Sequence, residues 1–284
     1  MTSTKTIITA VLSLLVCLTA RSQSLPALLV PTDARSLAMG GVSLPKEADQ
    51  LDAHAYFGKW APKTADNTIV GADAWFKIGS RLALSAEGKG FLDKPYSITG
   101  AEGSSKGSYK PYDLIIGLGA EFLITDAICA GLKVRNVTSA LAEKNIGSSI
   151  GGDIFVRYSS RVWGVELAGR NIGSPINYGE GAHSIPFLAA VSGYVRPVKG
   201  LTLAAEADYL FKGGLMASAG AEYGFKDMAF VRAGFHYGDP AKALPTFLSL
   251  GLGGKLAGFK LDGTFLLLSE TLGNSFLVSL GYEF

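Results

Sequence analysis

The chain has 284 residues, of which 48% are hydrophobic and only 18% are charged, and its mean hydropathy is +0.27. The formal net charge is +2, and without Lys5 and Arg21 the chain has 24 basic and 24 acidic residues. This balance argues against nucleic-acid binding and against bulk cation binding. After residue 20, no apolar run approaches the roughly 20 residues that a membrane-spanning helix needs. High hydropathy without long apolar runs is typical of many alternating β-strands.

The first 22 residues differ from the rest. Lys5 precedes an apolar core from Ile7 to Ala20, and Ala20 and Ser22 place small residues at positions −3 and −1 of a cleavage site before Gln23. This pattern predicts a secretory signal peptide over residues 1–22, followed by one domain over residues 23–284. A membrane anchor would need a longer apolar core.

The stretch 112–138 shows the clearest alternation. Apolar residues occupy the even positions from Tyr112 to Ile124, and Ile128, Ala130, Leu132 and Val134 continue the pattern after a turn at 125–127. Side chains leave a strand on opposite faces at every second residue, so this is a hairpin with one apolar face. A soluble protein would cover that face with a second sheet. In a membrane, lipid would cover it and the sheet would close on itself.

Similar glycine-broken segments follow one another along the chain. Together they predict an all-β fold, a transmembrane antiparallel β-barrel of about 14 strands, with residues 45–66 as a short helix or plug. Short links alternate with longer ones, and the longer stretches 92–111 and 172–185 are expected to be mobile, solvated loops rather than binding sites. The expected strands are 35–44, 68–77, 81–91, 112–124, 127–138, 149–159, 161–171, 186–196, 200–211, 214–225, 228–238, 246–256, 258–269 and 272–284.

The last segment carries apolar residues at alternate positions and ends in an aromatic residue. Phe276, Val278, Leu280, Tyr282 and Phe284 share one face. Such a strand resembles the signal that the outer-membrane assembly machinery recognises, and Tyr282 and Phe284 are its expected determinants. With the signal peptide, this predicts export to the outer membrane of a diderm bacterium. The alternative is an ordinary edge strand.

Alternation also predicts a charged interior. A polar conduit that selects a solute is one interpretation of this face, and cross-strand ion pairs that fill a narrow lumen are the other. Both signs are interleaved on adjacent strands, which favours ion pairs, because a selective pore more often shows a surplus of one sign. The residues expected to face the lumen are Asp113, Glu121, Lys133, Arg135, Asp153, Arg157, Glu166, Arg170, Glu206, Asp208, Glu222, Arg232, Lys260, Asp262 and Glu283.

No catalytic or cofactor motif emerges. An outer-membrane lipase would need a serine beside a histidine and an orienting third group. His54 and His183 lie in poorly patterned segments, and His236 falls on the inward face near a strand end. The histidines are far apart in sequence and Cys129 stands alone, so we expect no metal site, no cofactor and no enzymatic activity.

One short motif carries a family resemblance. Asp33 to Gly41, with Arg35, Met39, Gly40 and Gly41, resembles the opening of the PorV/PorQ family of outer-membrane barrels, relatives of the FadL fatty-acid channels. That family usually continues to an Asn-Pro-Ala element, where this chain has Trp60-Ala61-Pro62.

The resemblance implies a FadL-like barrel of fourteen strands beside the type IX secretion system, escorting or docking exported cargo. Its partners would be outer-membrane lipid, the assembly machinery and type IX components or cargo. A FadL-like channel for a hydrophobic small molecule is the first alternative. A structural barrel whose loops bind a partner is the second.

Overall fold

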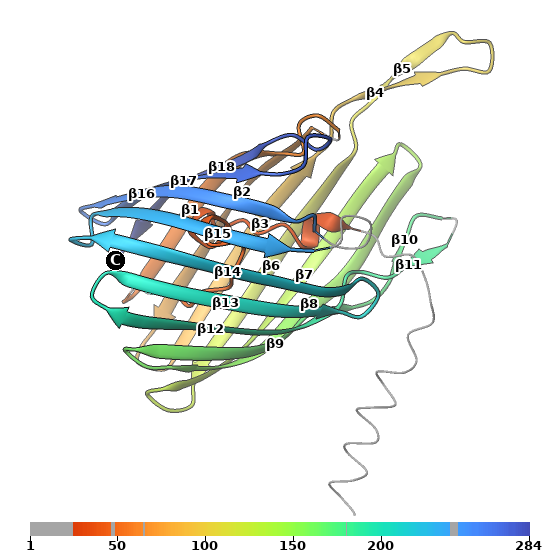
Figure 1. Cartoon of the computed structure of the whole chain (residues 1–284). Coiled ribbons are helices and arrows are strands. Elements are labelled where there is room, and N and C mark those ends of the chain that lie inside the picture. Colours follow the sequence, from red (N-terminus) through yellow and green to blue (C-terminus); the bar gives the residue numbers. More distant parts are fainter. Residues whose placement is uncertain (1–24, 47–48, 65, 180, 239–243) are drawn as a thin grey trace, which may run out of the picture.

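The computed structural model describes residues 25–46, 49–64, 66–179, 181–238 and 244–284. Fourteen antiparallel strands form one closed ring, which Figure 1 shows as a barrel. The predicted all-β barrel is therefore confirmed, whereas the predicted signal peptide over 1–22 lies outside the described residues. The strands of the ring are β1 (Leu51–Trp60), β2 (Asn67–Ile78), β3 (Leu82–Leu92), β6 (Tyr112–Leu123), β7 (Ile128–Ala142), β8 (Asn145–Ser159), β9 (Trp163–Gly173), β12 (Leu188–Val198), β13 (Leu201–Leu210), β14 (Gly214–Phe225), β15 (Ala229–Tyr237), β16 (Phe247–Leu256), β17 (Phe259–Leu267) and β18 (Ser275–Glu283).

The ring closes where its first and last strands meet. β1 pairs with β18 in antiparallel register, with Ala55 opposite Leu280, and its other edge pairs with β2. Closure leaves no strand edge of the ring unpaired, which is the condition for a sheet to lie in hydrocarbon.

The two ends of the barrel differ. At one end, the turn end, neighbouring strands are joined by short links such as 124–127 and 257–258. At the other, the loop end, two connections carry small sheets that project from the ring (Figure 1): β4 (Tyr96–Thr99) with β5 (Ser105–Tyr109), and β10 (Ile176–Asn177) with β11 (Ala182–His183). The segments 92–111 and 172–185, which we expected to be loops, thus contain short hairpins.

Alternation sorts the side chains of each strand between the two faces of the wall. Leu118 on β6 and Leu132 on β7 face outward and are 66% and 52% exposed, whereas Glu121 faces the lumen. The register places Leu118 opposite Val134, so apolar side chains of neighbouring strands meet on the outer face. Large exposed apolar side chains surround the barrel, and a closed sheet with such a surface spans a lipid bilayer.

The prediction of a first strand at 35–44 is wrong. Residues 34–38 form the short helix α2 (Ala34–Ala38), because the Asp33 carboxylate accepts hydrogen bonds from the backbone N–H groups of Arg35 and Ser36. Gly40 and Gly41 then adopt φ of +82° and +87°, a left-handed conformation that is incompatible with a continuous β-strand over 35–44. The first barrel strand is β1, inside the segment 45–66 that we expected to be a helix or plug.

Residues 25–46, which we call the plug, lie inside the barrel (Figure 1). The plug contains the 3-10 helix η1 (Pro26–Leu28) and α2. Its contacts begin on the loop side, where the Lys89 Nζ donates to the backbone oxygens of Ala27 and Val30 at 2.5 and 2.7 Å. No helix among the described residues is long and apolar enough to cross a membrane.

Candidate binding cavity in the lumen

The lumen is divided along its axis into an apolar half and a charged half. Toward the loop end, inward side chains from many strands bury apolar surface against the start of the plug. Toward the middle and the turn end, the inward positions carry charges. The apolar half includes Trp60, Ile69, Phe91, Ile115, Val137, Ile176, Leu188, Leu210, Phe247, Leu266 and Leu277 around Leu25, Ala27 and Val30.

Arg35, in the motif Asp33 to Gly41, binds the plug to the barrel wall. Its Nη2 lies 2.6 Å from Glu222 Oε1, and its Nε lies 2.8 Å from Glu222 Oε2. Arg232 continues the network, 2.6 Å from Glu222 and 2.6 Å from Asp262. Burial alone would raise the pKa of Asp33 in the same segment, but nearby Lys46, His54 and Arg35 and the Ser36 N–H hold that pKa below its usual value.

The glycines of the motif let the plug approach the wall closely. The Gly40 N–H donates to Ser249 Oγ at 3.1 Å, and the Ser249 hydroxyl donates to the Ala38 oxygen at 2.9 Å. On the wall, a Cβ at Gly234 would lie 2.1 Å from Gly40 N, and a Cβ at Gly220 would lie 2.4 Å from the Met39 oxygen. Glycine on both sides is therefore a packing requirement at this contact.

A second charged network lines the opposite wall, away from α2. Lys133 and Arg135 lie 2.8 and 3.2 Å from Glu87, and Arg135 also contacts Asp153. Nearer the turn end, Arg157 bridges Glu166 at 2.7 Å and Glu121 at 3.6 Å. Arg170 contacts Glu166 at 3.5 Å, Glu206 at 2.6 Å and Asp208 at 3.8 Å. Apart from Arg170–Glu166, which lies within β9, these pairs run between strands and join neighbouring parts of the wall.

Three members of the predicted lumen set, Asp113, Lys260 and Glu283, lie outside these networks. Lys260 sits near the turn end, 3.0 Å from Asp52 and 2.7 Å from Glu283. Asp113 lies at the loop end of β6 opposite Ser139 in register, and it has no ion pair within the described ranges. None of the three lines the cavity between the first part of the plug and the wall.

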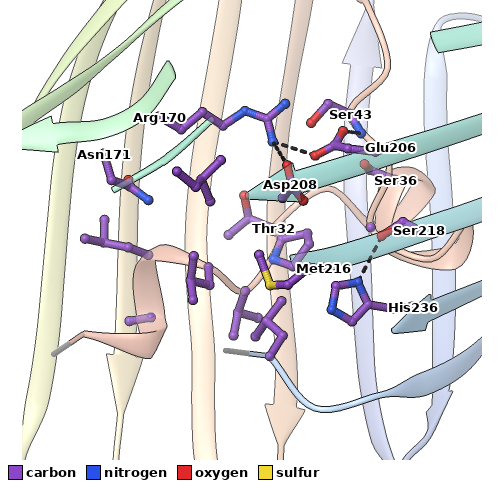
Figure 2. Close-up of a pocket in the computed structure, with 18 of the residues that line it drawn as sticks. Thr32, Ser36, Ser43, Arg170, Asn171, Glu206, Asp208, Met216, Ser218 and His236 are labelled. Atoms are coloured by element: carbon purple, nitrogen blue, oxygen red, sulfur yellow. Dashed lines mark hydrogen bonds and ion pairs between the residues drawn. The ribbon is translucent and has the colours of Figure 1, made fainter. Parts of the chain in front are cut away.

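That cavity has a volume of about 230 Å³ (Figure 2). Its roof is apolar and its floor is charged, because it lies where the two halves of the lumen meet. Plug residues between 27 and 43 form one side, and side chains of strands from β1 to β16 form the other. The apolar lining includes Ile115, Leu188, Met216, Leu244 and Phe247, and the polar lining includes Thr32, Arg170, Asn171, Asp208, Ser218 and His236.

Three buried polar side-chain atoms of residues that line this cavity make no hydrogen bond. Arg135 Nε still lies 3.2 Å from Glu87 Oε1, whereas the other two, Asp208 Oδ1 and His236 Nε2, belong to residues that are 6% and 3% exposed. The other ring nitrogen of His236 lies 2.9 Å from Ser218 Oγ, and the ring stacks on Phe247 with centroids 4.9 Å apart. An unsatisfied buried polar group costs about 1–3 kcal/mol, so both atoms favour a ligand that would pair with them.

Sequence reasoning placed Asp208 and Arg170 on the inward face but did not identify the cavity. It missed Glu87 and Lys89 as lumen residues, although the same alternation puts both inward. It noted His236 as inward near a strand end, without a partner. The pairing of His236 with Ser218 depends on the register of β14 against β15.

Further cavities continue toward the turn end. A cavity of about 270 Å³ shares Ser43, Glu87 and Arg170 with the first. A third, also of about 270 Å³, shares lining with the second at Trp75 and Arg157. The second and third cavities are lined by strands from β2 to β12, beside the plug rather than through it.

Comparisons with known proteins show a shared fold. No family model matches the chain, and no curated protein matches it in sequence. Among solved structures, the toluene transporter TbuX of Ralstonia pickettii superposes with a TM-score of 0.62 at 13% identity, over 90% of this chain and 99% of that one. The toluene transporter TodX of Pseudomonas putida gives a TM-score of 0.58 at 12% identity, over 92% and 98%. A Pseudomonas aeruginosa FadL homologue gives 0.55 at 11% identity, over 90% and 99%. The chain therefore has the closed barrel fold of FadL-like transporters, and the PorV/PorQ assignment finds no family match.

Proposed function

We propose that this protein is an outer-membrane channel for the uptake of a small, mainly apolar molecule, not an enzyme. The observation that carries the proposal is the cavity of about 230 Å³ between the plug and the wall, with Ile115, Met216 and Phe247 in its apolar lining. Ligand pockets are concave and combine apolar side chains with placed polar groups, and this cavity has an apolar side that faces a charged one. Solved structures with the same fold are described as toluene transporters and as a monoaromatic hydrocarbon channel, which supports the same class of cargo.

The loop end would face the outside and the turn end the periplasm, as in barrels with short periplasmic turns. A molecule held in the first cavity would continue through the second and third cavities toward the turn end. This route leaves the plug in place, because the Arg35–Glu222 contact lies on the other side of the lumen from Glu87 and Arg157.

The role in type IX secretion implied by the sequence resemblance gains no support from the solved structures, and neither does a purely structural barrel. The uptake alternative fits them better. A deletion strain separates the readings, because loss of toluene uptake with normal secretion supports the channel. Cargo stranded in the periplasm would instead favour the secretion role.

A bulky side chain placed in the second cavity tests the proposed route in the assembled protein. Ser85 lines the second cavity, whereas its neighbour Leu84 faces lipid. In the deletion strain, Ser85→Trp should slow the initial uptake of radiolabelled toluene relative to wild type, and Leu84→Trp should restore it fully. Both variants should reach the same level in the outer membrane. Equal uptake by both variants at equal levels would overturn the route, and wild-type uptake no higher than the deletion strain would overturn the channel.

A further inference from the structure

We propose that the cavity prefers apolar molecules that carry a hydrogen-bond donor, and that a small amine is the best-matched ligand. The proposal rests on the proposed function and names its substrate class. It follows from two features of the cavity: a carboxylate oxygen that accepts no hydrogen bond, and a pair of interacting carboxylates.

The acceptor is Asp208 Oδ1. Glu206 beside it is fully engaged, because its Oε1 accepts from Arg170 at 2.6 Å and its Oε2 accepts from the Ser43 N–H at 2.7 Å. Figure 2 shows Arg170 reaching both carboxylates, yet the Arg170 Nη1 lies 3.8 Å from Asp208 Oδ1, beyond hydrogen-bond distance. A ligand N–H or O–H would satisfy this atom, and a pure hydrocarbon would leave it without a partner.

Two of the carboxylates that line the cavity interact with each other. Four carboxylates and three cations line it, and Glu206 and Asp208 are the interacting pair. Lys89 and Arg135 are already occupied, by plug carbonyls and by Glu87 with Asp153. A cationic ligand group therefore gains charge complementarity, and an anionic one loses it. The carboxylates are Glu87, Asp153, Glu206 and Asp208, and the cations are Lys89, Arg135 and Arg170.

The remaining lining suits the apolar part of such a molecule. An apolar cavity of about 150 Å³ holds one benzene ring, so about 230 Å³ holds a ring with a short polar arm. Met216 lies opposite Asp208 in register and adjoins the apolar roof. His236 Nε2 supplies a second polar contact on the same side, since His236 and Met216 both line the cavity.

Four ligands that share a phenyl ring and differ in the group attached to it test this preference: benzylamine, benzyl alcohol, toluene and benzoate. Binding is measured by isothermal titration on the protein in lipid nanodiscs, with empty nanodiscs subtracted to remove partitioning into lipid. In wild type, we expect benzylamine to bind at least about tenfold more tightly than toluene, with benzyl alcohol between them and benzoate weakest. Equal affinity for benzylamine and toluene would overturn the donor preference while leaving the channel intact. No binding of any of the four, with no toluene uptake, would overturn the proposed function as well.

A substitution at Asp208 tests whether its carboxylate causes the preference for benzylamine over toluene. Asp208→Asn should abolish most of the advantage of benzylamine over toluene, because the amide cannot supply the charge. Asp227→Asn, in the exposed turn 226–228, removes a carboxylate far from the cavity and should leave the wild-type order unchanged. Retention of the full preference by folded Asp208→Asn protein would overturn the assignment, and if that variant fails to fold, the wild-type series still decides the donor preference.

Discussion

Arg35 on the plug and Glu222 on β14 form a two-point contact, with donor–acceptor distances of 2.6 and 2.8 Å between residues 187 positions apart in the sequence. The planar guanidinium matches the carboxylate, and both partners are largely shielded from water. The contact holds the plug against β14, and the second and third cavities lie between the plug and strands from β2 to β12. The position of the plug therefore decides where a ligand fits.

Removing this contact should loosen the plug. Arg35→Ala leaves Glu222 paired with Arg232 only, so we expect a loss of about 1–3 kcal/mol in the stability of the docked plug. A single cysteine introduced at Met39, which is fully buried, reports the change through its rate of labelling by a thiol reagent in a Cys129→Ser background. Labelling should be faster with Arg35→Ala and unchanged with Arg81→Ala, an exposed arginine near the turn end. Equal labelling rates in all three backgrounds would show that Arg35 does not hold the plug.

A methyl group at the glycine contact should displace the plug. Gly234→Ala would place a Cβ 2.1 Å from Gly40 N, a distance that the backbone must relieve by moving. Gly254→Ala on the next strand is the matched control, since a Cβ there meets nothing within 4 Å. In planar bilayers, we expect Gly234→Ala to raise the ion conductance of the barrel and Gly254→Ala to match wild type. The same conductance for Gly234→Ala and wild type would contradict the tight contact.

Charge should be tolerated on the lumen face and penalised on the lipid face. Arg at Leu118, Leu132 or Leu250, which are 52–66% exposed on the outer wall, should cost about 2–4 kcal/mol near the bilayer midplane. Ser85→Arg should cost less, because Ser85 lines a cavity of about 270 Å³ beside acidic side chains. Equilibrium unfolding from lipid vesicles measures both. If Leu118→Arg unfolds at the same denaturant concentration as Ser85→Arg, the assignment of faces is wrong.

The last strand should matter more for assembly than for stability. Tyr282 and Phe284 lie on the outer face of the wall, where Tyr282 packs against Phe259 with ring centroids 5.1 Å apart. Changing both to Ser removes little buried surface, but it removes the aromatic pattern that the assembly machinery would bind. We expect less folded protein by heat-modifiable gel migration, with Phe276→Ser on the same strand as the control. Normal insertion of the double variant would show that the strand carries no assembly signal.

The local sequence pattern was sufficient to predict how side chains are arranged in the barrel wall. The alternation from Tyr112 to Val134 predicted which side chains face lipid, and the structure confirms that Leu118 meets Val134 across two strands. Such predictions succeed because the strand repeat is two residues, and a shift of one residue would put every apolar side chain in the lumen. The same pattern predicted thirteen of the ring's strands, and the predicted total of fourteen counted 35–44 in place of β1.

The position of the N-terminal region was decided by the tertiary structure. Residues 35–44 contain enough apolar residues to suggest a strand, yet β1 takes the place in the ring because its edge fits β18. The outward positions of β1 include Ala53 and Ala55, which give only a weak apolar signal. Whether a segment joins the ring or fills its interior depends on partners more than 200 residues away.

The cavity is likewise a product of distant contacts. The sequence by itself determined that Asp208, Arg170 and His236 face inward, because each inward position follows from its neighbours. Only the tertiary structure decided that Asp208 lacks a hydrogen bond and that a space lies beside it. The register of β13 to β15 and the close fit of Gly40 against Gly234 set that space. Both depend on where separate parts of the chain meet in the closed barrel, which no local pattern of residues encodes.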